Sequence, residues 1–149
     1  VEFHAGEKPW GRVKADVYMP CATQNEIGLE DAKPMIEEGT SKLLIEVANM
    51  PTKAEAVEEL QKAGFMIAPS KAVNAGGVAV SALEMSQNAM KLSWTEEEVD
   101  EKLKKIMKNI FNNIDSAAKK YGMDGNLIAG ANIAGFLKVA EAMLDEGIF

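Results

Sequence analysis

The sequence contains few of the residues from which catalytic and metal sites are usually built. Its 149 residues include one histidine, His4, and one cysteine, Cys21. No GxGxxG, GxxxxGKS/T or HExxH motif is present. A single cysteine forms no internal disulfide, which is typical of a reducing cytosol. We therefore expect no metal site, no complete catalytic acid–base set and a cytoplasmic location.

Basic residues are fewer than acidic residues. Sixteen Lys and Arg against 23 Asp and Glu give a formal net charge of −7. Nucleic acids and anionic membrane surfaces bind basic patches, so we expect neither as a partner. We also expect no membrane span, which needs a run of roughly 20 apolar residues. The N-terminal stretch has no basic-then-apolar signal pattern, so nothing indicates secretion.

The first half of the chain alternates between short apolar runs and amphipathic segments. The expected strands are 13–20, 42–48 and 65–69. Helices are expected over 30–38 and from Thr52 to Gly64, where Thr52 and Glu55 form a capping-box pattern. Alternating strands and helices with short loops predict βαβ units and an α/β fold with a parallel sheet of about three strands.

The second half reads as helices alone. One is expected to begin at Val78. Another begins with a capping box, Thr95 to Glu98, and ends at Gly122.

A last helix is expected from near Asn126 to near Glu146. Its first half contains Gly130 and Gly135 among small apolar residues. Interior glycines cost a helix roughly 1 kcal/mol each against alanine, which is tolerable where a neighbouring backbone approaches closely. We therefore expect this helix to be buried.

Polar residues follow each expected strand, namely Asn25, Asn49 and Asn74. Ligands of open parallel sheets bind at the carboxyl ends of the strands, and an asparagine amide both donates and accepts hydrogen bonds. Each asparagine alone is explained as a turn residue. Their occurrence after three consecutive strands favours a ligand-binding edge.

The sequence allows a functional and a structural interpretation for each of two further residues, Ser81 and Cys21. Ser81 follows the flexible segment around Gly76 and Gly77; its hydroxyl either binds an anionic ligand near a helix N-terminus or bonds back to a helix carbonyl. Cys21 lies beside the predicted crevice, but no histidine is near it in sequence. A small packed residue is therefore favoured over a nucleophile.

Four stretches carry a resemblance to a known family. "VYMPCATQNEI", "EVANMPTKAEA", "APSKAVNAGGVAVSALEMSQNAMKLSW" and "GNLIAGANIAGF" closely resemble bacterial hexameric glutamate dehydrogenases. The resemblance extends from about Lys8 to Phe149 and implies the C-terminal part of such an enzyme. Residues 13–70 would form the second half of a Rossmann-like, doubly wound dinucleotide-binding domain, and residues 71–149 its C-terminal helices.

The resemblance implies reversible oxidative deamination of L-glutamate to 2-oxoglutarate and ammonia, with hydride transfer to NAD or NADP. Ala22 and Thr23 would flank the dinucleotide, and Asn49 would reach the nicotinamide or its ribose. Asn74 would lie between cofactor and substrate.

The same resemblance implies the substrate pocket. Gly77, Val78 and Ser81 would line it, with Ser81 bonding the distal carboxylate of glutamate. A substrate with a branched or aromatic side chain, as in related amino-acid dehydrogenases, would favour an apolar contact there instead. A non-catalytic nucleotide-binding or helical interaction module is a further alternative.

The family's catalytic lysine and aspartate and its glycine-rich loop belong to segments that are absent from these 149 residues. The resemblance therefore implies a piece of the enzyme that is inactive in isolation, from a parent that is a homohexamer. The residues that distinguish NAD from NADP are absent too, so the sequence leaves both open.

Overall fold

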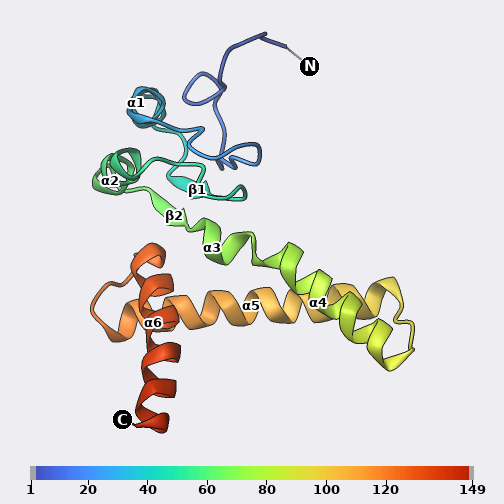
Figure 1. The fold of residues 1–149 in the computed structure, drawn as a ribbon. Coiled ribbons are helices and arrows are strands. Elements are labelled where there is room, and N and C mark those ends of the chain that lie inside the picture. Colours follow the sequence, from blue (N-terminus) through green and yellow to red (C-terminus); the bar gives the residue numbers. More distant parts are fainter. Residues whose placement is uncertain (1–2, 148–149) are drawn as a thin grey trace. The chain divides into compact units, whose positions relative to one another are not determined.

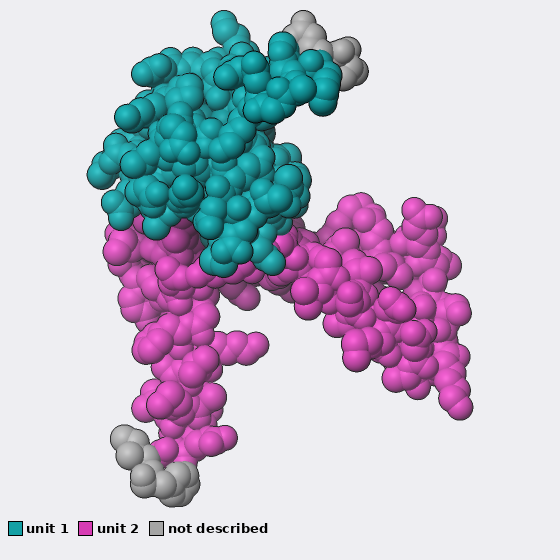
Figure 2. All heavy atoms as spheres, turned by 45° about the horizontal axis from the view of Figure 1, so that its top comes forward, with its two compact units in different colours: residues 1–70 teal, residues 71–149 magenta. Residues whose placement is uncertain are grey.

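The computed structural model describes residues 3–147 and divides into two compact units, residues 1–70 and residues 71–149 (Figure 2). In chain order the elements are α1 (Leu29–Glu38), β1 (Leu43–Ile45), α2 (Ala54–Lys62), β2 (Met66–Ala68), α3 (Ser70–Val73), α4 (Ala75–Met90), α5 (Glu96–Lys120) and α6 (Leu127–Glu146) (Figure 1). Unit 1 holds the sheet, and unit 2 is helical.

Unit 1 is built on a parallel pair of strands. β1 pairs with β2 from Leu43 opposite Met66 to Ile45 opposite Ala68, and α2 connects the two strands. Parallel strands need such a crossover because both run in the same direction. The predicted α/β class with a parallel sheet is confirmed.

The expected strand over 13–20 is reduced to a single bridge. Tyr18 pairs in parallel with Leu44. Its N–H donates to the Leu43 carbonyl at 3.0 Å, and its own carbonyl accepts from the Ile45 N–H at 2.9 Å. Pro20 has no N–H with which to extend the ladder. Among the described residues the sheet therefore has two strands, and Tyr18 marks the place of the expected third.

The core of unit 1 is built mainly from apolar side chains. Its fully buried side chains include Ile27, Met35, Leu44 and Leu60. The rings of Tyr18 and Phe65 stack with centroids 6.5 Å apart. Burying one large aliphatic side chain contributes about 1.5–3 kcal/mol, so these contacts hold the helices and strands of the unit together.

The predicted cap of α2 is wrong. The N-cap residue is Lys53, and the helix begins at Ala54. Thr52 is buried and forms a parallel bridge with Ile27, whose carbonyl accepts the Lys53 N–H at 2.9 Å. Backbone pairing therefore holds the segment up to Lys53 out of the helix.

Unit 2 contains α4, α5 and α6. The capping box at the start of α5 is confirmed, because Thr95 Oγ1 accepts from the Glu98 N–H at 3.3 Å and the Glu98 carboxylate accepts from the Thr95 N–H at 2.8 Å. The helix then continues for 25 residues to Lys120.

α6 crosses the C-terminal part of α5 (Figure 1). A Cβ on Gly130 would lie 2.1 Å from the carbonyl oxygen of Ile114, so the crossing needs glycine there. At Gly135, nothing in the described structure lies within 4 Å of the same position. The expected close backbone approach is confirmed at Gly130 alone.

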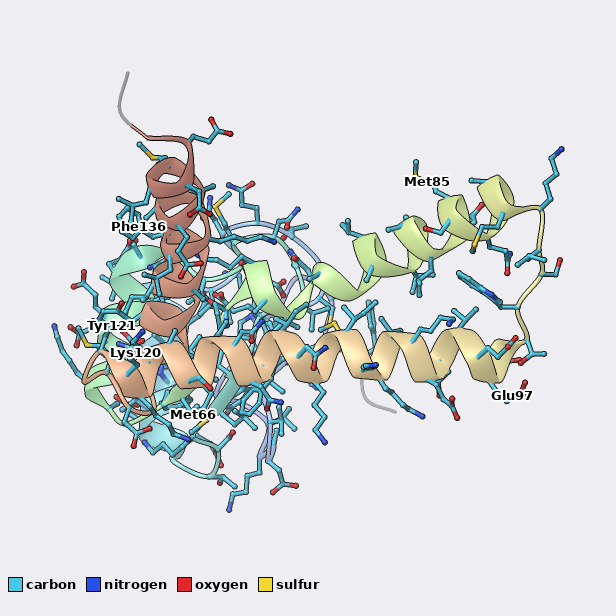
Figure 3. The ribbon with its side chains drawn as sticks, turned by 90° about the horizontal axis from the view of Figure 1, so that it is seen from below. Met66, Met85, Glu97, Lys120, Tyr121 and Phe136 are labelled. Carbon is cyan, nitrogen blue, oxygen red and sulfur yellow. The ribbon has the colours of Figure 1, made fainter. Side chains whose placement is uncertain are left out.

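The prediction that the last helix is buried is wrong beyond its first turns. Leu127, Gly130 and Ala131 are buried, whereas Phe136 is 70% and Leu144 80% exposed (Figure 3). The expectation of no membrane-spanning run also needs correction, since by length and composition α6 could cross a membrane. A core helix of a soluble protein meets the same criterion.

Candidate functional site

Two loops lie side by side at the carboxyl edge of the sheet in unit 1. The first comprises residues 20–26, and the second, the Asn49 loop, comprises residues 48–52. The Asn25 N–H donates to the Met50 carbonyl at 2.9 Å. Ligands of parallel sheets bind at this edge, so this hydrogen bond joins the two segments in which the sequence predicts the cofactor residues of unit 1.

Both residues of this hydrogen bond have left-handed backbones. Asn25 has φ 57° and Met50 has φ 44°. Residues with a side chain seldom adopt this conformation, and asparagine tolerates it better than methionine. The Asn49 loop therefore depends on its hydrogen bonds to keep Met50 in place.

The three predicted cofactor residues of unit 1 are all at the surface. Ala22 and Thr23 are exposed on the first loop, and Asn49 is exposed on the second. Thr23 brings a hydroxyl and Asn49 an amide, which are groups that suit ribose hydroxyls and a carboxamide. The fold thus brings these residues to one edge of the sheet from segments more than 20 positions apart.

The predicted substrate residues belong to unit 2, where α4 presents them together. Asn74 is the N-cap of the helix, and Gly77, Val78 and Ser81 follow at intervals of three, one and three residues. Positions related by three, four and seven lie on one face of a helix. α4 has no buried residue, and Val78 is 74% exposed. This set is the α4 face.

The expected flexible loop before this helix is wrong. α3 ends at Val73, and Asn74 has helical φ and ψ of −77° and −3°. The chain therefore continues directly into α4, with Gly76 and Gly77 in its first turn. The sulfur of Met107 would lie 3.5 Å from a Cβ on Gly76, whereas no described atom lies within 4 Å of one on Gly77. Gly77 leaves the α4 face open.

Ser81 lies almost two turns into α4, further than the sequence predicted. Its hydroxyl donates to the Gly77 carbonyl at 3.2 Å, and Ser86 makes the same kind of bond to Ala82 at 2.8 Å. The back-bond to the helix is therefore present. Both serines are exposed, and the oxygen of each can still accept a hydrogen bond from a ligand or solvent.

Cys21 is exposed, so its interpretation as a packed residue is wrong. It directly follows buried Pro20, and its side chain lies on the solvent side of the first loop. Its thiol contacts the Met19 carbonyl at 3.3 Å.

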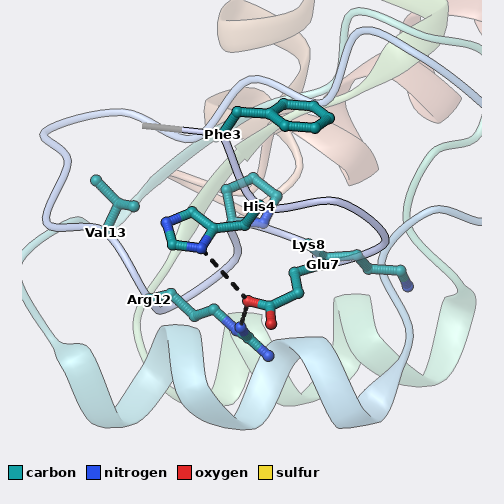
Figure 4. Close-up of a pocket in the computed structure, with 7 residues that line it drawn as sticks. Phe3, His4, Glu7, Lys8, Arg12 and Val13 are labelled. Carbon is teal, nitrogen blue, oxygen red and sulfur yellow. Dashed lines mark hydrogen bonds and ion pairs between the residues drawn. The ribbon is translucent and has the colours of Figure 1, made fainter. Parts of the chain in front are cut away.

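A hollow of about 380 Å³ lies near the N-terminus of unit 1 (Figure 4). Glu7 forms an ion pair with Arg12 there, and His4 Nδ1 lies 4.0 Å from the same carboxylate. None of its lining residues is a predicted cofactor residue. Among residues 3–147, no group of three or more His, Cys, Asp or Glu side chains is placed to hold a metal ion.

The sequence did not point to the buried carboxylate of Glu46, which lies beside the Asn49 loop in the chain. Glu46 is 6% exposed, directly after β1. Its Oε2 accepts the Ser70 N–H at 3.0 Å. The signal was a charged residue inside the apolar run "KLLIEVA", because a glutamate in a buried strand needs a hydrogen-bonding partner.

A βαβ unit with polar loops at its carboxyl edge defines an α/β protein of the ligand-binding kind. Residues 1–147 match the family model of the glutamate/leucine/phenylalanine/valine dehydrogenases. The chain therefore belongs to this dehydrogenase family.

Individual relatives agree with this assignment. The chain is 56% identical to the NAD-specific glutamate dehydrogenase of Clostridium symbiosum and 52% identical to the NADP-specific enzyme of Giardia intestinalis, over 99% of its length in both. A solved glutamate dehydrogenase structure superimposes on 99% of the chain with a TM-score of 0.92 and 55% identity, and 32% of that structure is covered. The chain spans 33% of the length of each of the two relatives.

Proposed function

We propose that this chain contributes cofactor-binding and substrate-binding surfaces to a glutamate dehydrogenase. The complete enzyme would convert L-glutamate to 2-oxoglutarate and ammonia, reversibly, with NAD or NADP. The observation that carries this proposal is the α4 face, which sets the Ser81 hydroxyl four residues from Gly77 and three from Val78. A hydroxyl at this point suits a substrate whose side chain ends in a carboxylate.

The groups at the carboxyl edge of unit 1 fit a nicotinamide dinucleotide. Thr23 and Asn49 supply a hydroxyl and an amide at the surface, and Ala22 leaves room for a flat ring or ribose. Asn74 would orient cofactor and substrate from the start of α4. When bound, the dinucleotide supplies the hydride acceptor, and these residues hold and orient it.

Ser81 gives the sharpest test of the substrate. The matching third of the Clostridium symbiosum enzyme would be replaced by this chain, and Ser81→Ala introduced into that chimera. We expect kcat/KM for glutamate to fall by about 1.5–3 kcal/mol, roughly 10- to 150-fold, which is the range for a hydrogen bond to a charged group.

Ser86→Ala is the matched control for this substitution. Ser86 makes the same back-bond on the same helix but lies off the α4 face, so its removal should leave kcat/KM unchanged. An unchanged value for Ser81→Ala would remove Ser81 from the site. A chimera that prefers leucine, phenylalanine or valine over glutamate would favour the second candidate, a branched or aromatic amino-acid dehydrogenase.

Three further properties belong to this proposal. The 149 residues alone should show no glutamate-dependent reduction of NAD or NADP, since the family's catalytic groups belong to other segments. The complete enzyme should be a homohexamer. It should act in the cytoplasm, without a nucleic-acid or membrane partner.

A further inference from the structure

We propose that Glu46 is a positioning residue that fixes the Asn49 loop through Ser70. All residues of this connection belong to unit 1. The connection is a feature of the fold, whereas its effect on the cofactor rests on the proposed function, in which Asn49 faces the dinucleotide.

The connection starts where the backbone ladder of the sheet ends. The Glu46 N–H donates to the Ala68 carbonyl at 3.0 Å, which is the last bond between the two strands. Alternate residues of β2, Met66 and Ala68, bond to the first strand's side, so the next donor in this alternation is the N–H of Ser70. The Glu46 carboxylate accepts it at 3.0 Å. A side chain thus takes over where the backbone ladder stops.

Burial makes this bond important. Glu46 is 6% exposed, so water cannot readily replace the Ser70 N–H as its partner. A buried carboxylate that loses a donor, or a buried N–H that loses its acceptor, is costly. Ser70 is therefore held in one position relative to β1.

Ser70 passes this constraint to the Asn49 loop. Its Oγ accepts the Met50 N–H at 3.4 Å, while the Met50 carbonyl accepts the Asn25 N–H at 2.9 Å. Met50 is thus bonded through both its N–H and its carbonyl, and it has the unfavourable φ of 44°. Asn49 directly precedes Met50, so the orientation of its backbone depends on the same bonds.

Amide hydrogen exchange tests the connection in the 149-residue chain itself. Glu46→Ala should raise the exchange rates of the Ser70 and Met50 amides by about tenfold or more. The Ser70 N–H loses its acceptor, and the Met50 N–H loses the fixed position of its acceptor, Ser70 Oγ. Glu46→Gln keeps an acceptor oxygen of the same length and should restore most of the protection. Unchanged rates in Glu46→Ala would overturn the proposal.

Ser70→Ala covers the case in which Glu46→Ala does not fold. This variant keeps the backbone N–H of position 70 and removes only the Oγ acceptor. Exchange should therefore rise at the Met50 amide and stay low at the amide of position 70. Equal protection of Met50 in wild type and Ser70→Ala would also overturn the proposal.

Kinetics of the chimera test the consequence for the cofactor. In Ser70→Ala we expect KM for NAD or NADP to rise about three- to tenfold, with kcat and the KM for glutamate within twofold of wild type. A general loss of structure would instead lower kcat and also change the KM for glutamate, and Ser86→Ala should change none of the three parameters. An unchanged cofactor KM would refute the positioning role. A chimera that is inactive toward glutamate while the exchange pattern holds would refute the proposed function and leave the connection standing.

Discussion

Unit 1 and unit 2 each hold their own predicted binding residues in place, and they do so by different means. In unit 1, Leu44 is completely buried in the middle of β1, a few residues before the loop that carries Asn49. In unit 2, α4 carries Asn74 to Ser81 without one buried residue. The loops that carry the predicted cofactor residues therefore adjoin a buried core, whereas α4 depends on its own backbone hydrogen bonds and its contact with α5.

Large apolar side chains on α4 and α6 are more exposed than those in the core of unit 1. Met85 on α4 is 72% exposed and Phe136 on α6 is 70% exposed (Figure 3). In unit 1, Met35 and Phe65 are buried in the core, whereas Met50 and Met66 are 57% and 47% exposed. Substitutions of the same chemistry should therefore have large effects in the core of unit 1 and small effects at exposed positions of unit 2.

Leucine truncation should give the largest contrast. Leu44→Ala should lower the free energy of unfolding by about 2–5 kcal/mol, because it opens a cavity in the core. Leu144→Ala, at a position that is 80% exposed, should change it by less than about 0.5 kcal/mol. Urea unfolding would be followed by Trp10 fluorescence in a Trp94→Phe background for Leu44→Ala, and by Trp94 fluorescence in a Trp10→Phe background for Leu144→Ala, because each tryptophan reports on its own unit. Equal effects of the two truncations would contradict the comparison.

Two glycines of α6 should respond with opposite signs. Gly130→Ala would push a methyl group into the Ile114 carbonyl and should destabilise unit 2 by about 1–3 kcal/mol. Gly135→Ala meets open space and should stabilise the helix by up to about 1 kcal/mol. Trp94 fluorescence in a Trp10→Phe background measures both. A stabilising Gly130→Ala would show that the crossing of α5 and α6 is looser than described.

A smaller, pH-dependent effect belongs to the edge of unit 1. Hydrogen bonds from Thr40, with a further one from Tyr18, lower the pKa of Glu38, although burial acts in the opposite direction. A lowered folded-state pKa stabilises the fold above the unfolded-state pKa, and this contribution is lost as pH falls through the folded-state value.

Glu38→Gln removes this contribution, so the variant should be less stable than wild type at neutral pH. The difference should shrink as the pH falls through the folded-state pKa of Glu38, so the variant loses less stability upon acidification. Melting temperatures from neutral to acidic pH would measure this effect. Glu37→Gln, one residue earlier on the exposed side of α1, is the control. Parallel melting curves for wild type and Glu38→Gln would contradict this account of Glu38.

Local signals in the sequence predicted most of the elements. The capping box at Thr95, the close approach at Gly130 and the parallel βαβ order were all predictable, because each depends on residues close in sequence or on a strong periodic pattern. The errors arose where distant segments compete. Thr52 was predicted as a helix cap, but pairing with Ile27 keeps it in an extended segment.

The candidate site was likewise predicted only in part from the sequence. The sequence pointed to Asn49, Asn74 and Ser81, but it placed Gly76 and Gly77 in a loop, since glycine pairs usually mark turns. Glu46 was missed because its partner, Ser70, lies 24 residues away. The exposure of α6 was missed too, since an apolar pattern predicts a face that can be buried and does not state what covers it.

The central claim is that the residues of the α4 face serve glutamate and that those of the Asn49 loop serve a nicotinamide dinucleotide. Its most direct test is steady-state glutamate oxidation by the Clostridium symbiosum enzyme carrying this chain in place of its matching third. We predict glutamate-dependent reduction of NAD or NADP that Ser81→Ala weakens by roughly 10- to 150-fold. A folded chimera without that activity, or one in which Ser81→Ala and Ser86→Ala behave alike, would contradict it.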